Sequence, residues 1–166
     1  MRNQHSIILT TKPKLWKVEI DHELLYERLS QETSYLAKKN SEALSDDHII
    51  LDDDKPLIKY YRSLAISDLT SLLARRLDVN IEVEGDSNTG LTEAGNKTTY
   101  CLVVDDNMEN SLQTSLQNYC FEYVVLRVME MWYKQPQGSD MMKDSILKVL
   151  DFRRRPVRRP VRSFLY

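Results

Sequence analysis

Hydrophobic residues recur at helical spacing in four stretches of the chain, and the first two have clear starts. The first begins near Asp21, which can cap a helix N-terminus, and fades through residues 38–40. The second follows Asp54 as a cap, with Pro56 in the first turn, where a missing N–H costs nothing. A broad apolar face then runs through residues 57–77. Both stretches therefore predict helices with locally encoded N-termini.

The third helical stretch, at about 108–134, is the longest and is apolar nearly all round. Such a helix is typical of a central position, buried on several sides, and we expect its broad apolar surface to need partners as well. Pro136 and Gly138 end it. Ser139 then caps a predicted final short helix.

Two segments have the shorter period of β-strands. Residues 5–20 look extended, interrupted by Pro13, and predict a small hairpin or an N-terminal arm. Residues 81–84 and part of 99–104 alternate around 85–97, which is rich in Gly, Ser, Asn and Thr. This pattern predicts a β-hairpin whose loop is long enough to reach a neighbour.

Together these elements predict an α+β fold that is mainly α: a helical bundle with an inserted β-hairpin and an extended C-terminal arm. The expected organisation is an extended segment at 1–20, a helical domain at 21–151 with the hairpin at about 79–105, and an Arg/Pro-rich arm at 152–166. A length of 166 residues fits one such domain.

Composition indicates in which compartment we expect the protein. No stretch approaches the roughly 18 apolar residues that span a bilayer, and the N-terminus does not resemble a signal peptide, so we expect no membrane association and a cytosolic product or one assembled in a cytosol. Cys101 and Cys120 are surrounded by apolar residues and predict buried thiols rather than a disulfide framework.

The charge is unevenly distributed. The net charge is −2, yet residues 152–166 carry six arginines and no acid, so the rest of the chain sums to −8. An acidic body with a basic end is typical of an interaction tail. Within this tail a four-residue unit occurs twice, at 155–158 and 159–162, and its prolines favour an extended backbone.

Three interpretations of the tail remain open: a docking arm on another protein, a nucleic-acid-binding segment, or a solvated extension without a role. The fixed valine spacing and the apolar residues that close the sequence favour docking, with arginines on carboxylates and the apolar residues in a groove. The predicted partner-binding residues are Arg153, Arg154, Arg155, Pro156, Val157, Arg158, Arg159, Pro160, Val161, Arg162, Phe164, Leu165 and Tyr166.

A polar, acidic loop is predicted at residues 40–55, with one short strand at 49–51 as an option. Its aspartates could suggest a divalent-metal site, but they lack the glycine and spacing of a calcium loop. A solvated loop that caps the next helix is the simpler interpretation. The same patch is a candidate acceptor for an arginine tail from another subunit, through Asp46, Asp47, Asp52, Asp53 and Asp54.

No catalytic or cofactor-binding motif is visible, so we expect a non-enzymatic protein without cofactors. His5, His22 and His48 are far apart in the sequence, and no glycine-rich phosphate loop precedes a helix. The tyrosines and tryptophans fall mostly on helical faces beside Leu and Val, which is typical of core residues.

The order of elements resembles the head-to-tail connector, or adaptor, proteins of tailed bacteriophages. The resemblance is carried by the helix at 57–77, the hairpin at 81–104, the long helix at 112–132 and the arm at 153–166, and in outline it covers residues 21–166. It is a resemblance of architecture, without a diagnostic motif. The extended residues 5–20 and the acidic loop depart from the simplest adaptor plan.

The resemblance implies a structural protein of the virion, assembled in the host cytoplasm. It implies copies arranged in a ring, hairpin loops and C-terminal arms that reach the portal or neighbouring ring proteins, and DNA passing through the lumen. The runner-up is a nucleic-acid-associated accessory protein that uses the basic tail on phosphates.

Overall fold

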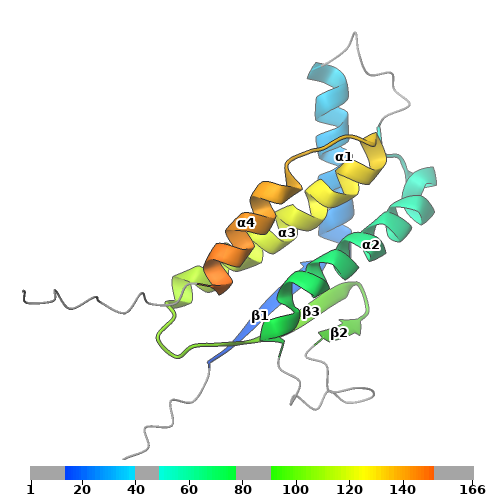
Figure 1. The fold of residues 1–166 in the computed structure, drawn as a ribbon. Helices are drawn as coiled ribbons and strands as arrows, with labels where there is room; N and C mark the ends of the chain where they lie inside the picture. Colours follow the sequence, from blue (N-terminus) through cyan, green and yellow to red (C-terminus); the bar gives the residue numbers. More distant parts are fainter. Residues whose placement is uncertain (1–13, 40–48, 78–90, 152–166) are drawn as a thin grey trace, which may run out of the picture.

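The computed structural model describes residues 14–39, 49–77 and 91–151 and shows an α+β fold that is mainly helical, as the sequence predicts (Figure 1). The described strands are β1 (Lys14–Asp21), β2 (Leu91–Ala94) and β3 (Lys97–Val104). The described helices are α1 (His22–Lys39), α2 (Lys55–Leu73), α3 (Asn110–Tyr133) and α4 (Ser139–Leu150), with short 3-10 turns η2 (Asp52–Asp54) and η3 (Ala74–Arg76).

β1 is part of the sheet on which the domain is built, rather than a separate hairpin or arm. The sheet has the order β1-β3-β2 with antiparallel pairing, and β1 pairs with β3 along its whole length, from Lys14 opposite Val104 to Asp21 opposite Lys97. One face of the sheet is buried, because alternate side chains of a strand point to the same side. Its buried side chains are Trp16, Val18, Ile20, Thr98, Tyr100, Leu102 and Val104.

The hairpin turns at a different place from the one predicted. Strand β2 and a two-residue turn, Gly95 and Asn96, occupy part of the stretch 85–97 that the sequence pattern assigns to a loop. Gly95 has φ +61°, a conformation that glycine adopts easily, and Gly-Asn is a common two-residue hairpin turn. The polar composition of residues 85–97 led to the prediction of a long loop, although Gly95-Asn96 is a turn signal within it. The other predicted strand, 81–84, lies outside the described residues.

The N-terminus of α1 is the predicted one, but that of α2 is built differently. The Asp21 carboxylate accepts hydrogen bonds from the backbone N–H groups of Glu23 (2.9 Å) and Leu24 (3.2 Å), as an N-cap does. Asp54 makes no such bond to α2. Its carboxylate accepts instead from the N–H of Leu51 (2.8 Å), because η2 runs directly into α2 and already holds Asp54 in a helical conformation. Residues 49–51 form no strand.

The turn from α3 to α4 also corrects a predicted cap. Gly138, at φ +92°, occupies the cap position, and Ser139 is the first helical residue. The N–H groups of Gln137 and Ser139 both donate to one carboxylate oxygen of Glu130, at 3.2 and 3.1 Å. A glutamate of the preceding helix therefore holds the backbone just before α4 and at its first residue, and Gly138 takes the cap position that was predicted for Ser139.

Helix α3 is the centre of the helical layer. It packs against α1, α2, α4 and β1, with α2 on one side of it and α4 on the other (Figure 1). The apolar breadth of this helix is used inside the subunit, which corrects the expectation that it needs outside partners. Its buried residues are Leu116, Cys120, Tyr123, Val124, Val125, Val128 and Met129.

Two glutamines of α3 close the outer edge of β1. The backbone N–H of Glu19 donates to the side-chain oxygen of Gln117 (2.7 Å), and the amide nitrogen of Gln117 donates to the Glu19 carbonyl (2.5 Å). Gln113 donates in the same way to the Lys17 carbonyl (3.3 Å). An edge strand whose backbone groups are occupied by side chains is a poor template for another strand. These contacts therefore disfavour the addition of a partner strand at Lys17 and Glu19.

Candidate interaction surfaces

Helix α2 exposes a line of large apolar side chains on its outer face. Leu57, Tyr60 and Leu64 are 43%, 58% and 40% exposed. Their spacing of three and four residues puts them on one side of the helix. We call these three residues the α2 stripe.

The α2 stripe faces away from the core. The opposite side of the same helix is buried, and its buried residues are Ile58, Ala65, Ile66, Leu69 and Leu73. The sequence predicted a broad apolar face at 57–77, and the fold divides that face into a buried half and an outward half. Because exposed apolar residues on one helix face are typical of interaction sites, the α2 stripe is a candidate contact surface.

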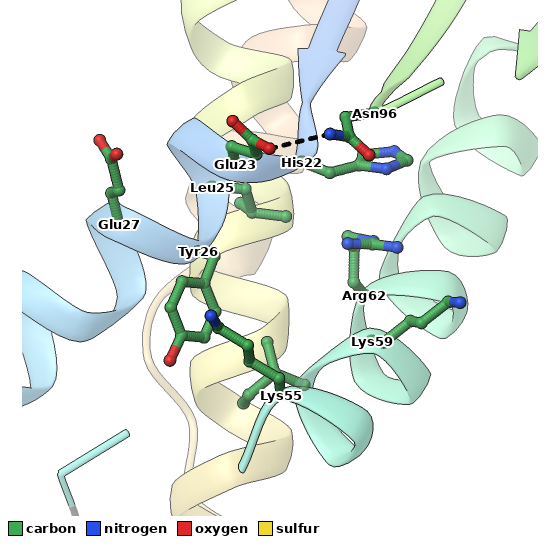
Figure 2. Close-up of a pocket in the computed structure, with 10 residues that line it drawn as sticks. His22, Glu23, Leu25, Tyr26, Glu27, Lys55, Lys59, Arg62 and Asn96 are labelled. Carbon is green, nitrogen blue, oxygen red and sulfur yellow. Dashed lines mark hydrogen bonds between the residues drawn. The ribbon is translucent and has the colours of Figure 1, made fainter. Parts of the chain in front are cut away.

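A groove lies beside this helix, between α1 and α2 (Figure 2). Each of the two helices packs on α3, and they make little contact with each other, which leaves a cavity of about 510 Å³. We call it the α1–α2 groove. Its lining residues are His22, Glu23, Leu25, Tyr26, Glu27, Lys55, Ile58, Lys59, Arg62 and Asn96.

The wall of the groove formed by α2 is basic. Lys55, Lys59 and Arg62 are spaced by four and three residues, so they lie on one side of the helix. Lys55 already has partners: its Nζ is 3.3 Å from an Asp52 carboxylate oxygen and 5.0 Å from the centre of the Tyr26 ring. Lys59 is exposed, with no ion pair to a described carboxylate.

Arg62 is the most unusual group in the groove. Its side chain is half-buried, yet no described residue forms a hydrogen bond or an ion pair with its guanidinium. Burial lowers the pKa of Arg62, and the charge of Glu93 on β2 only partly opposes this effect. The guanidinium has thus lost hydration without gaining a direct partner among the described residues.

His22 stands at the end of the groove, with the Arg62 guanidinium directed towards its ring (Figure 2). The Nε2 atom of His22 lies 2.8 Å from the hydroxyl oxygen of Thr98. Burial lowers the pKa of His22, and the positive charge of Arg62 lowers it further, against the weaker opposing effects of Glu93 and Asp21. We therefore expect a neutral imidazole at pH 7, which can bind by hydrogen bonding.

The wall formed by α1 is acidic. Glu23 accepts a hydrogen bond from the side-chain amide of Asn96 (2.9 Å), which fixes one carboxylate near the turn of the hairpin. Glu27 is exposed and points away from Arg62 (Figure 2). The groove therefore offers opposite charges on its two sides, and its positive side holds Arg62, which pairs with no residue in the described ranges.

Sequence reasoning did not identify the residues of this groove. The spacing of Lys55, Lys59 and Arg62 was available in the sequence as a basic stripe on the predicted helix. Nothing local, however, could show that His22, forty residues before Arg62, would lie against it.

The predicted acidic patch is only partly described, since Asp46 and Asp47 lie outside the described residues. Asp52 interacts with Lys55 and accepts from the Tyr26 hydroxyl (3.3 Å), and Asp54 caps the preceding turn. Asp53 is exposed. Within the described ranges, no group of three or more His, Cys, Asp or Glu side chains could hold a metal ion.

The predicted partner-binding residues of the arm, 153–162 and 164–166, also lie outside the described residues. The two thiols are free: Cys120 is buried, with burial raising its pKa to about 12, whereas Cys101 is partly exposed. Among the helices described, none is long and apolar enough to cross a membrane.

No protein-family model, curated protein or solved structure matches the chain.

Proposed function

We propose that the protein is a structural assembly protein that forms a homo-oligomer, with the α2 stripe as a contact between copies. The observation that carries the proposal is the outward position of Leu57, Tyr60 and Leu64 on a helix whose other face is already buried. Covering apolar side chains of this size releases roughly 25 cal/mol for each Å² removed from water. The contacts of Gln113 and Gln117 with β1 disfavour strand addition at that part of the sheet.

The kind of oligomer is inferred from the resemblance of the chain to phage head-to-tail connectors. On that basis the copies form a ring within a virion, the arm at 152–166 docks on the portal or on a neighbouring ring protein, and DNA passes through the lumen. The acidic body supports the last point, because a negative wall does not retain DNA.

The native mass of the full-length chain tests the assembly proposal. We expect a concentration-dependent oligomer for the wild type and dissociation for the double variant Tyr60→Ser, Leu64→Ser. The matched control is Met141→Ser, since Met141 is 71% exposed on α4 and lies outside the stripe. A wild-type monomer at all concentrations, or equal effects of stripe and control variants, would count against the proposal.

The role of the arm is tested by truncation after Asp151. If the arm docks on protein partners, removing it abolishes ordered assembly with the portal or ring partner, or with further copies. If the truncated chain assembles as well as the complete one, the arm has no docking role.

The second candidate function is nucleic-acid association through the arm, favoured by its six arginines. Each phosphate neutralised contributes about −0.9 to the slope of log affinity against log salt for duplex DNA. A steep slope that disappears on truncation after Asp151, with assembly unchanged, would support this alternative over docking.

A further inference from the structure

Arg62 is the central cation of the α1–α2 groove. Its side chain projects from α2 towards the end of the groove, where His22 and Asn96 stand (Figure 2). A half-buried guanidinium that has lost water without pairing raises the free energy of the protein. An oxyanion placed against Arg62 restores these interactions, because the planar guanidinium matches the two oxygens of a carboxylate or a phosphate.

Lys59 adds positive potential on the same side of the groove. It lies three residues before Arg62 on one face of α2, and it is exposed, with no ion pair to a carboxylate in the described ranges. Lys55 contributes less, because its Nζ lies 3.3 Å from an Asp52 carboxylate oxygen. The α2 side of the groove therefore attracts an anion towards Arg62.

The opposite side of the groove limits how much negative charge a ligand can carry. Glu23 and Glu27 on α1 line that side, and the charge of Glu93 on β2 acts on Arg62. A phosphate dianion or a nucleic-acid backbone would bring several negative charges close to these carboxylates, and like charges repel. A single carboxylate meets the guanidinium with less repulsion.

The remaining lining suits an apolar ligand body. Leu25 and Ile58 lie at the base of the groove, and the Tyr26 ring forms part of its wall. This ring is held in place, because its hydroxyl donates to an Asp52 carboxylate oxygen (3.3 Å) and Lys55 Nζ lies 5.0 Å from its centre. The groove volume of about 510 Å³ is within the range of about 300–1,000 Å³ that is usual for small-molecule sites.

The groove is separate from the proposed contact between copies. At 100° per residue, the α2 residues that line the groove, 55, 58, 59 and 62, lie on the opposite side of the helix from the α2 stripe. A ligand in the groove therefore leaves the stripe free for a second copy.

We propose that the α1–α2 groove is a binding site for a small organic monocarboxylate, whose carboxylate pairs with Arg62 and whose apolar body lies against Tyr26. Lys59 attracts the ligand from the rim, and His22 offers a neutral hydrogen-bonding ring at the end of the groove. This site goes beyond the proposed assembly function and does not depend on it.

Titration of the full-length chain with benzoate, followed by nuclear magnetic resonance, tests the site. We expect a dissociation constant on the order of 1 mM, since a ligand of so few atoms binds weakly. Benzamide has the same shape without the charge and should bind about tenfold more weakly. Signals of the His22 ring and of the Asn96 side-chain amide should shift, because both residues stand at the end of the groove. Equal binding of benzoate and benzamide would overturn the proposal.

The titration of His22 gives a second readout. After burial, the positive charge of Arg62 is what lowers the pKa of His22, against the opposing charges of Glu93 and Asp21. A carboxylate bound to Arg62 offsets that positive charge, so saturation with benzoate should raise the His22 pKa. An unchanged His22 pKa in the saturated wild type would show that the ligand does not bind at Arg62.

Substitutions give an independent test. Arg62→Gln should weaken benzoate binding about tenfold or more, and Lys59→Gln about threefold. The control is Arg75→Gln, because Arg75 is an exposed arginine about 20 Å further along the axis of α2 and should change the affinity less than about twofold. Urea unfolding shows whether each variant is folded, and the comparison of benzoate with benzamide in the wild type needs no variant. Equal effects of Arg62→Gln and Arg75→Gln would contradict the assigned contact.

The outcomes separate this proposal from the assembly proposal. If neither benzoate nor isovalerate binds the wild type at about 10 mM, the groove proposal is wrong, whatever the oligomeric state. A wild-type monomer that binds benzoate overturns the assembly proposal alone. If inorganic phosphate binds more tightly than benzoate and loses affinity in Arg62→Gln, the groove binds phosphate and the monocarboxylate proposal is wrong.

Discussion

Glu130 on α3 holds the turn that leads into α4, and its replacement by glutamine is the most informative perturbation of the fold. One carboxylate oxygen accepts the N–H groups of Gln137 and Ser139, and the other accepts from Arg127 Nη1 at 2.9 Å. The side chain is only 14% exposed. Glutamine keeps the shape, but its NH₂ group cannot accept the hydrogen bond from Arg127 or that of the backbone groups, whichever way it points.

The expected cost follows from these contacts. Hydrogen bonds to a charged group contribute about 1.5–3 kcal/mol each when buried, against about 1 kcal/mol for neutral ones. Arg127 is 37% exposed and also pairs with Asp68, so its bond to Glu130 is discounted to about 0.5–1 kcal/mol. The two backbone hydrogen bonds also become weaker, because a neutral amide oxygen accepts less strongly than a carboxylate. Together with the lost Arg127 bond, we expect this to lower the free energy of unfolding of Glu130→Gln by about 2 kcal/mol. Glu130→Ala, which leaves both N–H groups without an acceptor, should cost about 3–4 kcal/mol.

The effect should depend on pH with a definite sign. Burial tends to raise the pKa of Glu130, but the hydrogen bonds from Ser139, Arg127 and the backbone outweigh it, and the net pKa is lowered. A carboxyl whose folded-state pKa is depressed contributes stability above its unfolded pKa of about 4.3, and this stability is lost as pH falls through the folded-state value. The difference in free energy of unfolding between wild type and Glu130→Gln should therefore have its whole value at pH 7 and become smaller below about pH 4.

Urea unfolding followed by circular dichroism, at one fixed protein concentration, measures this difference. The control is Glu122→Gln, because Glu122 forms a partly exposed ion pair with Arg28 at 3.4 Å, and such pairs contribute about 0–1 kcal/mol. A cost for Glu130→Gln below about 0.5 kcal/mol at pH 7, or one that does not change with pH, would refute the role assigned to this carboxylate.

Three further predictions concern single positions. Trp16→Phe should lower the free energy of unfolding by only about 1 kcal/mol, since the lost packing is offset in part by removing a buried indole N–H that has no hydrogen-bond partner in the part of the chain that the structure describes. A cost above about 3 kcal/mol in urea unfolding would contradict this. Gly95→Ala should cost about 1 kcal/mol because φ at this turn is +61°, and an unchanged thermal midpoint would contradict the turn geometry. In the native protein at pH 8, a thiol reagent should leave Cys120 unmodified and react with Cys101, while denaturant exposes both; rapid modification of Cys120 would show that it is not buried.

Features that depend on neighbouring residues were predictable from the sequence. The start of α1 at the Asp21 cap and the first turn of α2 at Pro56 follow from contacts within a few residues. The mainly helical α+β class follows in the same way from hydrophobic periodicity. The errors were also local: Gly95 and Asn96 form a turn inside a stretch judged by its composition, and Ser139 was assigned the cap position that the neighbouring Gly138 occupies.

Features that depend on residues far apart in the sequence were not predictable. The extended character of β1 was visible in the sequence, but its partner β3 lies about eighty positions further along the chain. The contact of Gln117 with the backbone of Glu19 joins residues that are equally far apart. The apolar residues of α2 were visible too, although their pattern does not tell which of them α3 covers.

The sequence by itself determined where helices form, that the body is acidic and that a basic segment with two prolines follows it, because periodicity, caps and charge are properties of short stretches. Only the tertiary structure decided that the breadth of α3 is buried within the subunit, that Leu57, Tyr60 and Leu64 face outward, and that Arg62 meets His22 in a groove. The physical reason is that the packing of elements far apart in the sequence decides which side chains are buried and which meet. Packing buries one side of a helix and leaves the other side exposed.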